Sequence, residues 1–430
     1  MNRQLLHIAP IFLALLIPLV DRATAIIFTA VFALGIYILY NRKKEWFLRE
    51  QEQKKGYSLG VIFYPISVLV LMIIFPMHIA IAAWAIMALG DGFATIFGEK
   101  FPIKKIPWNP DKSLGGTLAF ILFGTLGAAF FLWYLGGLES VYRLILFALG
   151  TAFVAALVES SSLRIEDNLS VPLAAGLFLH SLTFTQFPFA ISLDNVLIGI
   201  LLSSIAAFVA LDKGAINLRG ATMGAILSVS IFSFLGINGF LVGLAFFVLG
   251  SAATKFKHRD KAKQGLGHDR KIRSGRNVIS NSIVAVYCAL LAVATPFNEV
   301  FLLAFTAAIA AANSDTLSSE LGQIFGKKPF MITNFRPAEP GLNGAISIQG
   351  TFIGLLGAAA IAAVSFLVGL ISFNFMIIAT IAGFAGMLID SVLGATLENS
   401  NWLGNESVNF LCTLSAVLIA IIVSTLILGV

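Results

Sequence analysis

Charged side chains are scarce in this sequence, and their scarcity decides the class of protein before any motif is considered. Lys, Arg, Asp and Glu make up 12% of the 430 residues, whereas soluble globular proteins carry about 25%. Hydrophobic residues reach 58%, and the mean hydropathy is +0.93. A soluble chain of this size needs far more polar surface. The composition therefore predicts an all-α polytopic membrane protein and excludes soluble enzymes.

Cysteine, metal motifs and nucleotide-binding loops are also few or missing. Cys288 and Cys412 both lie inside apolar segments, so neither a disulfide framework nor a CxxC site is expected. The five histidines lack HExxH or similar spacing, which argues against a zinc site. No GxxxxGK run followed by Ser or Thr occurs, which excludes P-loop chemistry. The basic residues lie in loops between apolar segments, so the expected partner is membrane lipid and not nucleic acid.

Long apolar segments fill most of the chain. A spanning helix needs about 20 predominantly apolar residues. By that criterion the sequence predicts about fifteen spans: 4–20, 23–40, 58–75, 77–97, 116–136, 140–158, 169–186, 190–210, 221–236, 239–254, 278–295, 298–313, 347–370, 373–394 and 407–429. The first is followed directly by Asp21-Arg22 and a second apolar run, so we expect an uncleaved helix and not a signal peptide.

Basic residues are distributed very unevenly between the two sides of these predicted spans. Long polar loops follow every second span, and with the N-terminus they hold 26 of the 28 Lys and Arg residues; the exceptions are Arg22 and Arg143. The positive-inside rule then predicts that the N-terminus and the long loops are cytoplasmic. Since the N-terminus is not rich in Arg and Ser as a transit peptide is, we expect a bacterial plasma membrane.

The two halves of the chain follow a similar plan. Each has an acidic residue ending one span, a Gly-Thr pair opening the next, and an acidic residue ending the one after: Asp91, Gly116-Thr117 and Glu159, then Asp315, Gly350-Thr351 and Asp390. Because an even number of spans separates matching positions, the halves are expected to be parallel repeats. The predicted domains are residues 1–190 and 191–430.

Polar side chains of the first half gather at predicted cytoplasmic helix ends. A carboxylate such as Asp91 costs about 2.5–3.5 kcal/mol inside hydrocarbon on insertion scales, so it is rarely without a function. Lys112 and Ser113 precede Gly115-Gly116-Thr117 at a helix start, where backbone N–H groups form an anion site. Glu159 and Asp167 add carboxylates that Mg²⁺ can bridge to phosphates. A metal–nucleotide site is the interpretation favoured here, and a solvated acidic loop is the alternative.

Over about residues 50–175 these motifs resemble the CTP-dependent polyprenol kinases, including dolichol kinase and, more closely, phytol kinase. The resemblance rests on Gly90-Asp91-Gly92-Phe93-Ala94, Pro107-Trp108-Asn109-Pro110, Lys112-Ser113, Gly115-Gly116-Thr117, Glu159, Asp167-Asn168-Leu169 and Val171-Pro172. Family members often carry Asp-Asp-Asn-Leu where this chain has Glu166-Asp167-Asn168-Leu169, a change that keeps the charge. The resemblance implies phosphoryl transfer from CTP to an isoprenoid alcohol. The same superfamily includes phosphatidate cytidylyltransferases, so nucleotidyl transfer is a rival.

The second half carries its own candidate residues. Asp315 and Glu320 lie five residues apart at a helix exit and suit one cation. Asp390 has apolar neighbours and is costly unless paired. Arg336 is a candidate fork for a substrate phosphate. Arg276 closes a loop with nine basic residues (255–277), for which contact with anionic lipid is an equal interpretation.

Residues 212–415 resemble the membrane family that includes plant phytyl-phosphate kinase. Matching features are Leu249-Gly250-Ser251, Asn313-Ser314-Asp315-Thr316, Ser319-Glu320-Leu321-Gly322, Arg336-Pro337, Leu342-Asn343-Gly344, Gly350-Thr351, Asp390-Ser391 and Val408-Asn409-Phe410. The resemblance implies a second phosphorylation, with Asn343 and Thr351 among the phosphate-binding residues.

The sequence therefore predicts a fused, two-step isoprenoid-alcohol kinase. The first half is expected to make a prenyl monophosphate and the second half the diphosphate, each with Mg²⁺ and CTP. Asp91, Glu159 and Asp167 are the predicted carboxylates of the first site, with Lys112, Ser113, Gly115, Gly116, Thr117 and Asn168 on the phosphates. Asp315, Glu320 and Asp390 are those of the second. A cytidylyltransferase and a lipid transporter stay open as alternatives.

Overall fold

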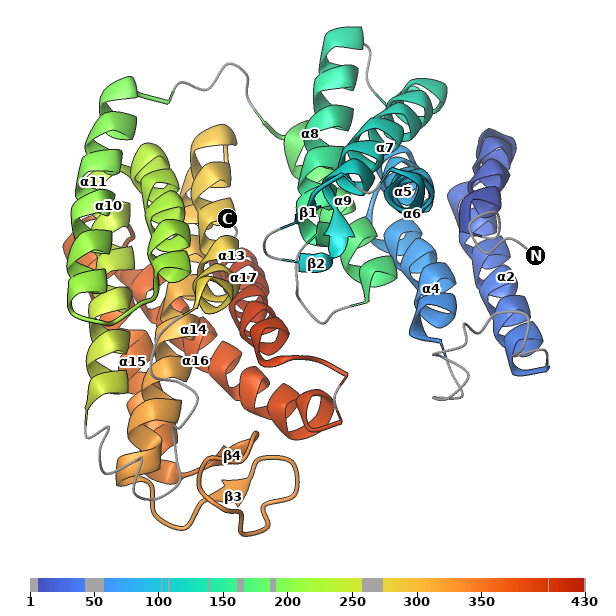
Figure 1. Ribbon diagram of the computed structural model, residues 1–430. Coiled ribbons are helices and arrows are strands. Elements are labelled where there is room, and N and C mark those ends of the chain that lie inside the picture. The colour runs from blue at the N-terminus through green and yellow to red at the C-terminus, as the bar shows by residue number, and fades with distance from the viewer. Residues whose placement is uncertain are drawn as a thin grey trace. The chain divides into compact units, whose positions relative to one another are not determined.

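The computed structural model describes residues 7–42, 58–101, 103–106, 109–137, 140–160, 166–185, 191–256, 274–400 and 402–428. They form two compact units, Met1–Phe184 and Thr185–Val430 (Figure 1). Each unit has its own hydrophobic core. The domain boundary predicted after residue 190 falls outside the described residues, and the assignment of one activity to each half stays a prediction.

The described part of unit 1 is almost entirely helical. Its elements are η1 (Ala9–Leu19), α2 (Arg22–Arg42), α4 (Leu59–Ile74), α5 (Met77–Ala85), η3 (Ile86–Asp91), α6 (Gly92–Lys100), β1 (Lys105–Ile106), β2 (Asn109–Ser113), α7 (Leu114–Tyr134), α8 (Val141–Ser160) and α9 (Asp167–Thr183). The α5, η3 and α6 segments follow one another without a break and form the most buried helix of the unit. Five of its nine residues from 80 to 88 are fully buried alanines, and these small side chains let α7, α8 and α9 approach closely.

The described part of unit 2 is also almost entirely helical. Its elements are α10 (Leu193–Asp212), α11 (Leu218–Lys255), α13 (Gly275–Ala294), α14 (Asn298–Phe325), β3 (Phe330–Met331), β4 (Ala345–Ile346), α15 (Ile348–Leu367), α16 (Phe373–Leu393), η4 (Gly394–Glu398) and α17 (Asn405–Leu428). Helix α14 is central and contacts α11, α13, α15, α16 and α17. Backbone carbonyls of α15 fix it there: Asn313 Nδ2 donates to Gly357 O (2.9 Å), and Ser314 Oγ donates to Gly354 O (2.8 Å).

Among the described residues, eleven helices are long and apolar enough to cross a membrane, where the sequence predicts about fifteen. Three of the predicted spans are shorter helices, and two others are counted as one. The first and third are shorter apolar helices, Ala9–Leu19 and Leu59–Ile74, and that predicted at 169–186 is the 17-residue α9. The spans predicted at 221–236 and 239–254 are counted together as α11, but Gly236 has the non-helical angles φ 62° and ψ −154° and separates two helices there, at the predicted turn.

In each unit the most buried helix is followed by a hairpin and then by a helix with a serine cap. The β1–β2 hairpin leads to Ser113, whose Oγ accepts from Gly116 N (3.2 Å). The β3–β4 hairpin leads to Ser347, whose Oγ accepts from Gly350 N (3.1 Å). A π-helical segment also lies next to a conspicuous acid in each unit, η3 ending at Asp91 and η4 starting four residues after Asp390. The repeat itself stays a prediction.

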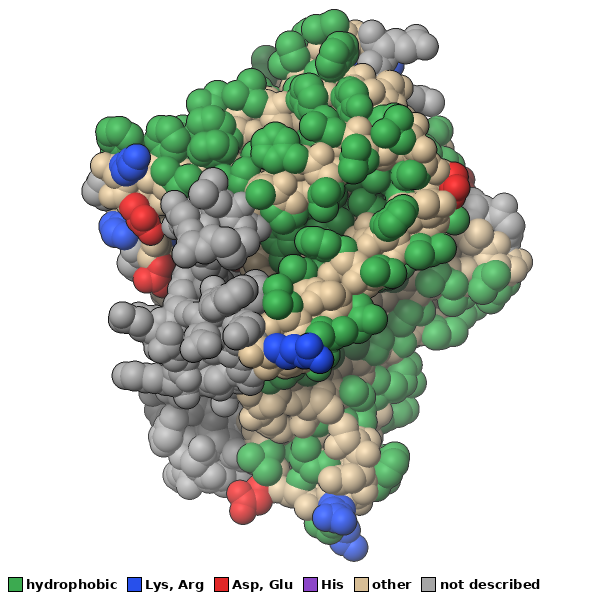
Figure 2. Space-filling model, turned by 90° about the vertical axis from the view of Figure 1, so that its right-hand side faces the viewer, with side chains coloured by type: hydrophobic (Ala, Val, Ile, Leu, Met, Phe, Trp, Pro, Cys, Tyr) green, Lys and Arg blue, Asp and Glu red, His purple; other side chains and the backbone are tan. Residues whose placement is uncertain are grey.

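The outward faces of the spans carry large apolar side chains. On α2, Ile27, Phe28, Val31 and Leu34 are each more than half exposed. Figure 2 shows hydrophobic side chains spread over the face it presents, with few charged ones between them. By contrast Cys288 and Cys412 are 2% and 1% exposed and lie in the cores. Lipid is the environment that such an outward surface requires.

The close contact between α14 and α16 gives a testable consequence. A Cβ on Gly383 would lie 2.7 Å from Ala310 Cβ and 3.0 Å from the carbonyl carbon of Ala310. Gly383→Leu should therefore destabilise the protein by about 1–3 kcal/mol through overpacking, seen as a lower midpoint of thermal aggregation in detergent. Gly35→Leu on α2, where nothing lies within 4 Å, is the matched control. Equal midpoints for the two variants would contradict the packing.

Candidate active sites

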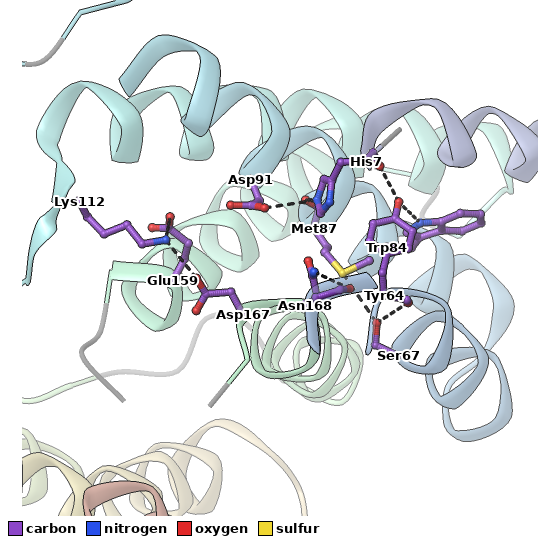
Figure 3. Close-up of polar contacts among 11 residues, drawn as sticks. His7, Tyr64, Ser67, Trp84, Met87, Asp91, Lys112, Glu159, Asp167 and Asn168 are labelled. Carbon is purple, nitrogen blue, oxygen red and sulfur yellow. Dashed lines mark hydrogen bonds and ion pairs between the residues drawn. The ribbon is translucent and has the colours of Figure 1, made fainter. Parts of the chain in front are cut away.

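Lys112 joins two carboxylates from separate helices of unit 1. It lies on β2, and its Nζ donates to Glu159 Oε1 at the end of α8 (2.5 Å) and to Asp167 Oδ2, the first residue of α9 (3.0 Å) (Figure 3). Glu159 is only 4% exposed, whereas Lys112 and Asp167 keep 27% and 39% of their side chains exposed. The three side chains thus form a cluster that is open on one side, as a site for an incoming ligand must be.

The charges of this cluster influence one another's pKa values. Burial alone would lower the pKa of Lys112, but the carboxylates of Asp167, Glu159 and Asp91 together outweigh it and raise that pKa. Lys112 therefore stays an ammonium ion at neutral pH. Burial is also the largest influence on Asp167 and raises its pKa, while Lys112 opposes this effect. The negative charge of Asp91 raises the pKa of Lys112 and that of Asp167.

Asp91 has a partner that the sequence did not reveal. His7 Nε2 lies 3.3 Å from Asp91 Oδ2 and 3.2 Å from Met87 O, so this nitrogen faces two acceptors. The backbone of His7 is fixed in turn, because its carbonyl accepts from Tyr64 OH (2.7 Å), which accepts from Trp84 Nε1 (3.0 Å) (Figure 3). No sequence pattern marks His7, which is 84 residues from Asp91; only the packing of the N-terminal segment on η3 brings them together.

The residues of unit 1 that the sequence predicts to bind phosphate are in different environments. Ser113 Oγ caps α7, and Asn168 Nδ2 donates to Gly60 O (3.0 Å), so both side chains already hold structure together. A Cβ on Gly115 would lie 2.5 Å from Phe101 O, and one on Gly116 3.0 Å from Ala94 O. These glycines therefore permit the close approach of α7 to the α6 region. Thr117 Oγ1 is buried and finds no hydrogen-bond partner among the described residues.

Unit 2 contains a cavity of about 380 Å³. Asp315 and Glu320 line it, together with Thr316 and Ser319 of the same helix, α14. Further polar lining residues come from α13 and α17: Asn277, Asn281, Ser282, Asn405, Glu406 and Asn409. The sequence analysis missed Glu406 as a site residue. Its position two residues before Val408-Asn409-Phe410, a motif of the resemblance, was the available signal.

The other predicted residues of unit 2 lie outside the lining of this cavity. Asp390 is buried on α16 (8% exposed). Arg336 is exposed in the loop between β3 and β4, and Asn343 accepts through its carbonyl from Asn399 Nδ2 (3.3 Å). Thr351 is in the first turn of α15. Arg276 is exposed at the start of α13, and most of the basic loop before it is outside the described residues.

Within the described ranges, no group of three or more His, Cys, Asp or Glu side chains is arranged to hold a metal ion. Mg²⁺ commonly takes one or two protein carboxylates and completes its shell with water and substrate phosphates. The carboxylate oxygens of Asp91, Glu159 and Asp167 are donors of the kind that this mode uses. Magnesium binding by either unit stays a prediction.

Taken with the fold, the sequence defines the class of protein. The chain belongs to the family described as "Integral membrane protein DUF92", which matches residues 201–417 and so includes all the described residues that line the cavity of unit 2. It is 39% identical over 201 residues to an uncharacterized membrane protein of Synechocystis sp., covering 46% of this chain and 78% of that protein.

Two plant proteins are also similar. The chloroplastic protein VTE6 of Arabidopsis thaliana is 34% identical over 201 residues, 45% of this chain and 60% of that one. Phytol kinase 1 of Arabidopsis thaliana, also chloroplastic, is 36% identical over 123 residues, 27% of this chain and 40% of that one. The chain thus spans less than two thirds of the length of either plant relative. No solved structure matches the chain.

The cluster around Lys112 predicts a stability effect. Lys112→Met leaves the two acidic side chains facing each other, so the unfolding midpoint in detergent at neutral pH should fall by several degrees. Because the folded pKa of Lys112 is raised, the contribution of its charge is present at neutral pH and is lost only as alkaline pH passes that pKa.

Two further variants test this explanation. Adding Glu159→Gln to Lys112→Met should restore part of the loss, since one of the uncompensated charges is removed. Lys100→Met, at the exposed end of α6, should leave the midpoint unchanged. A Lys112→Met midpoint equal to that of the wild type would show that the ion pairs contribute nothing to stability.

Proposed function

We propose that the chain is an isoprenoid kinase with two active sites. The first phosphorylates a prenol such as phytol to its monophosphate, and the second phosphorylates the monophosphate to the diphosphate. The observation that carries the proposal is the ion-paired cluster of Lys112, Glu159 and Asp167. The similarity to a plant protein named phytol kinase supports the reaction class.

The chemistry of the first site follows from these groups. Phosphoryl transfer depends mainly on positioning and on neutralising charge. Asp91 accepts the proton of the alcohol as its oxygen forms a bond to the γ-phosphorus, and the bond to the bridging oxygen breaks to release the nucleoside diphosphate. His7 orients Asp91 through their 3.3 Å contact. Lys112 and the backbone N–H groups at the start of α7 stabilise phosphate charge. Mg²⁺, held by these carboxylates, would neutralise the nucleotide.

The second site is assigned to unit 2. Asp315 and Glu320 line its cavity, and Asp390 lies nearby in the core. We assign Arg276, Arg336, Asn343 and Thr351 to the phosphates, as the resemblance implies. The common order of buried helix, hairpin and serine-capped helix supports two parallel repeats joined by gene fusion. Fusion keeps a membrane-bound monophosphate close to the site that uses it.

CTP is the proposed donor, and both sites are proposed to open to the cytoplasm of a bacterial plasma membrane. Two rival functions predict different products. A CTP-dependent cytidylyltransferase would give a CMP-lipid and pyrophosphate, and a transporter would leave every lipid unlabelled. Membranes containing the chain, γ-labelled CTP or ATP, Mg²⁺ and a series of prenols should yield label first in a monophosphate and then in a diphosphate.

Asp91→Asn should lower the rate of monophosphate formation by about 10²–10⁴-fold, as expected for loss of a general base. Prenyl monophosphate supplied directly should still be converted to the diphosphate at the wild-type rate. Asp111→Asn, exposed on β2, is the matched control and should be fully active. Wild-type monophosphate formation by Asp91→Asn membranes would refute the assignment of the first site.

The reverse pattern is expected for unit 2. Asp315→Asn should stop conversion of supplied monophosphate while prenol is still phosphorylated once, so the monophosphate should accumulate. Glu299→Gln, exposed in the first turn of α14 at the opposite end from Glu320, serves as the control. Loss of both steps in Asp315→Asn, with the protein still folded, would contradict the division of labour between the units.

A further inference from the structure

The β3–β4 hairpin of unit 2 lies where helix α15 enters the membrane. With 20 residues, α15 is about 30 Å long, which is the thickness of the hydrocarbon core of a bilayer. Large apolar side chains are exposed at both of its ends, since Ile348 is 75% exposed and Leu367 is 78% exposed. Hydrocarbon therefore begins close to Ile348, two residues after the end of β4. Figure 1 shows the hairpin at one end of the helices of unit 2.

Backbone hydrogen bonds fix the part of this hairpin between residues 327 and 338, here called the tip. Met331 N donates to Arg336 O (2.9 Å), and Phe335 N donates to Met331 O (2.9 Å). Ala338 N donates to Pro329 O (3.0 Å). The two sides of the tip are thus joined at several points, and its backbone has a defined conformation.

Phe335 is the most unusual residue of the tip. Its φ of 55° lies in the left-handed region, which a bulky side chain rarely adopts. Its ring stacks on that of Phe330, with 5.9 Å between the ring centroids, and yet 75% of the residue is exposed. A conformation of this kind is costly and persists only where the surroundings fix it. Water around the ring would leave the cost uncompensated, whereas the boundary between headgroups and acyl chains is an environment that suits exposed Phe side chains.

The charges beside Phe335 are mainly positive. The segment 327–346 has three basic side chains and one acidic side chain: Lys327, Lys328, Arg336 and Glu339. Lys327 and Lys328 are both exposed. Basic residues close to a bilayer attract anionic headgroups, and this attraction acts over about a Debye length. Lysines within a few residues of the hydrocarbon boundary are in that range.

The hairpin of unit 1 combines the same types of exposed residue. Phe101 and Ile103 are each more than half exposed, and Lys104 and Lys105 next to them are also exposed. Leu114 N, at the start of the 21-residue helix α7, donates to Lys104 O (3.0 Å). Two hairpins of different sequence therefore present apolar side chains beside a pair of lysines at the start of a span. The membrane surface is an environment that explains both.

We propose that the tip of the β3–β4 hairpin is a lipid-binding surface and that its partner is the anionic surface of the bilayer. Phe335 enters the headgroup region, while Lys327 and Lys328 contact anionic headgroups. Arg336 keeps its assignment to a substrate phosphate, because this surface needs only its backbone. The surface goes beyond the proposed function, since it involves no phosphoryl transfer.

The depth of the tip in the bilayer provides the first test. Thr333→Cys, at an exposed position of the tip, is labelled with an environment-sensitive fluorophore. The full chain is then placed in nanodiscs of phosphatidylcholine and phosphatidylglycerol. A nitroxide on the lipid, just below the headgroup, should quench the label strongly, and iodide in the water should quench it weakly. In Phe335→Gly, quenching by iodide should rise at least threefold, because the ring no longer enters the bilayer.

Glycine is chosen at this position because it adopts a positive φ without strain, so the tip should keep its conformation. Phe373→Ala, at the exposed start of α16 beyond the other end of α15, is the matched control and should leave the quenching unchanged. Equal quenching by iodide in Phe335→Gly and in its parent would overturn the proposal. Protection from iodide without quenching by the lipid nitroxide would also overturn it, since protein and not lipid would then cover the tip.

The choice between lipids tests the lysines. At low salt, nitroxide-labelled phosphatidylglycerol should quench the label at Thr333→Cys at least twofold more than nitroxide-labelled phosphatidylcholine. Lys327→Gln combined with Lys328→Gln should reduce this preference by at least half, as should high salt. Lys213→Gln, at the exposed end of α10, is the matched control. Equal quenching of the parent by the two lipids would overturn the contact between the lysines and anionic headgroups.

Discussion

Ionised carboxylates at the ends of membrane helices must be compensated, and in unit 1 the compensation comes from Lys112. The contacts around Lys112 fix the position of its ammonium group. The β1–β2 hairpin carries it from α6 to α7, the Ser113 cap fixes the turn that follows, and Gly115 and Gly116 allow the close approach behind it. Since Glu159 ends α8 and Asp167 begins α9, the same ion pairs fix the ends of two helices.

The acidic residues of unit 2 have surroundings that differ from those in unit 1. Its cavity brings Asp315, Glu320 and Glu406 to one space without a described basic residue in the lining. In unit 1 a described lysine lies between two carboxylates, whereas the described lining of the unit 2 cavity combines carboxylates with the amides of Asn277, Asn405 and Asn409. The two units therefore present polar groups of different kinds.

Much of this organisation could be predicted from the sequence, for physical reasons. Apolar runs of bilayer length fix the helices, and a carboxylate in such a run is too costly to be incidental, which is why Asp91, Glu159 and Asp167 could be grouped with Lys112. The grouping of Asp315 with Glu320 needed only the spacing along one helix. His7 and Glu406 could not be found in this way, since their places depend on contacts between segments far apart in the chain. Ser113 and Asn168 look like ligand-binding residues in the sequence, yet a cap and an interhelical hydrogen bond already use them.

Both thiols of this chain lie inside the helical cores, and this burial has a practical consequence. A maleimide that cannot cross the bilayer reaches only cysteines that are exposed to water. The unaltered chain is therefore not expected to react with such a maleimide, and single cysteines can be introduced into it, one polar loop at a time. The side of the membrane on which each loop lies can then be determined without first removing Cys288 or Cys412 and opening cavities in the two cores.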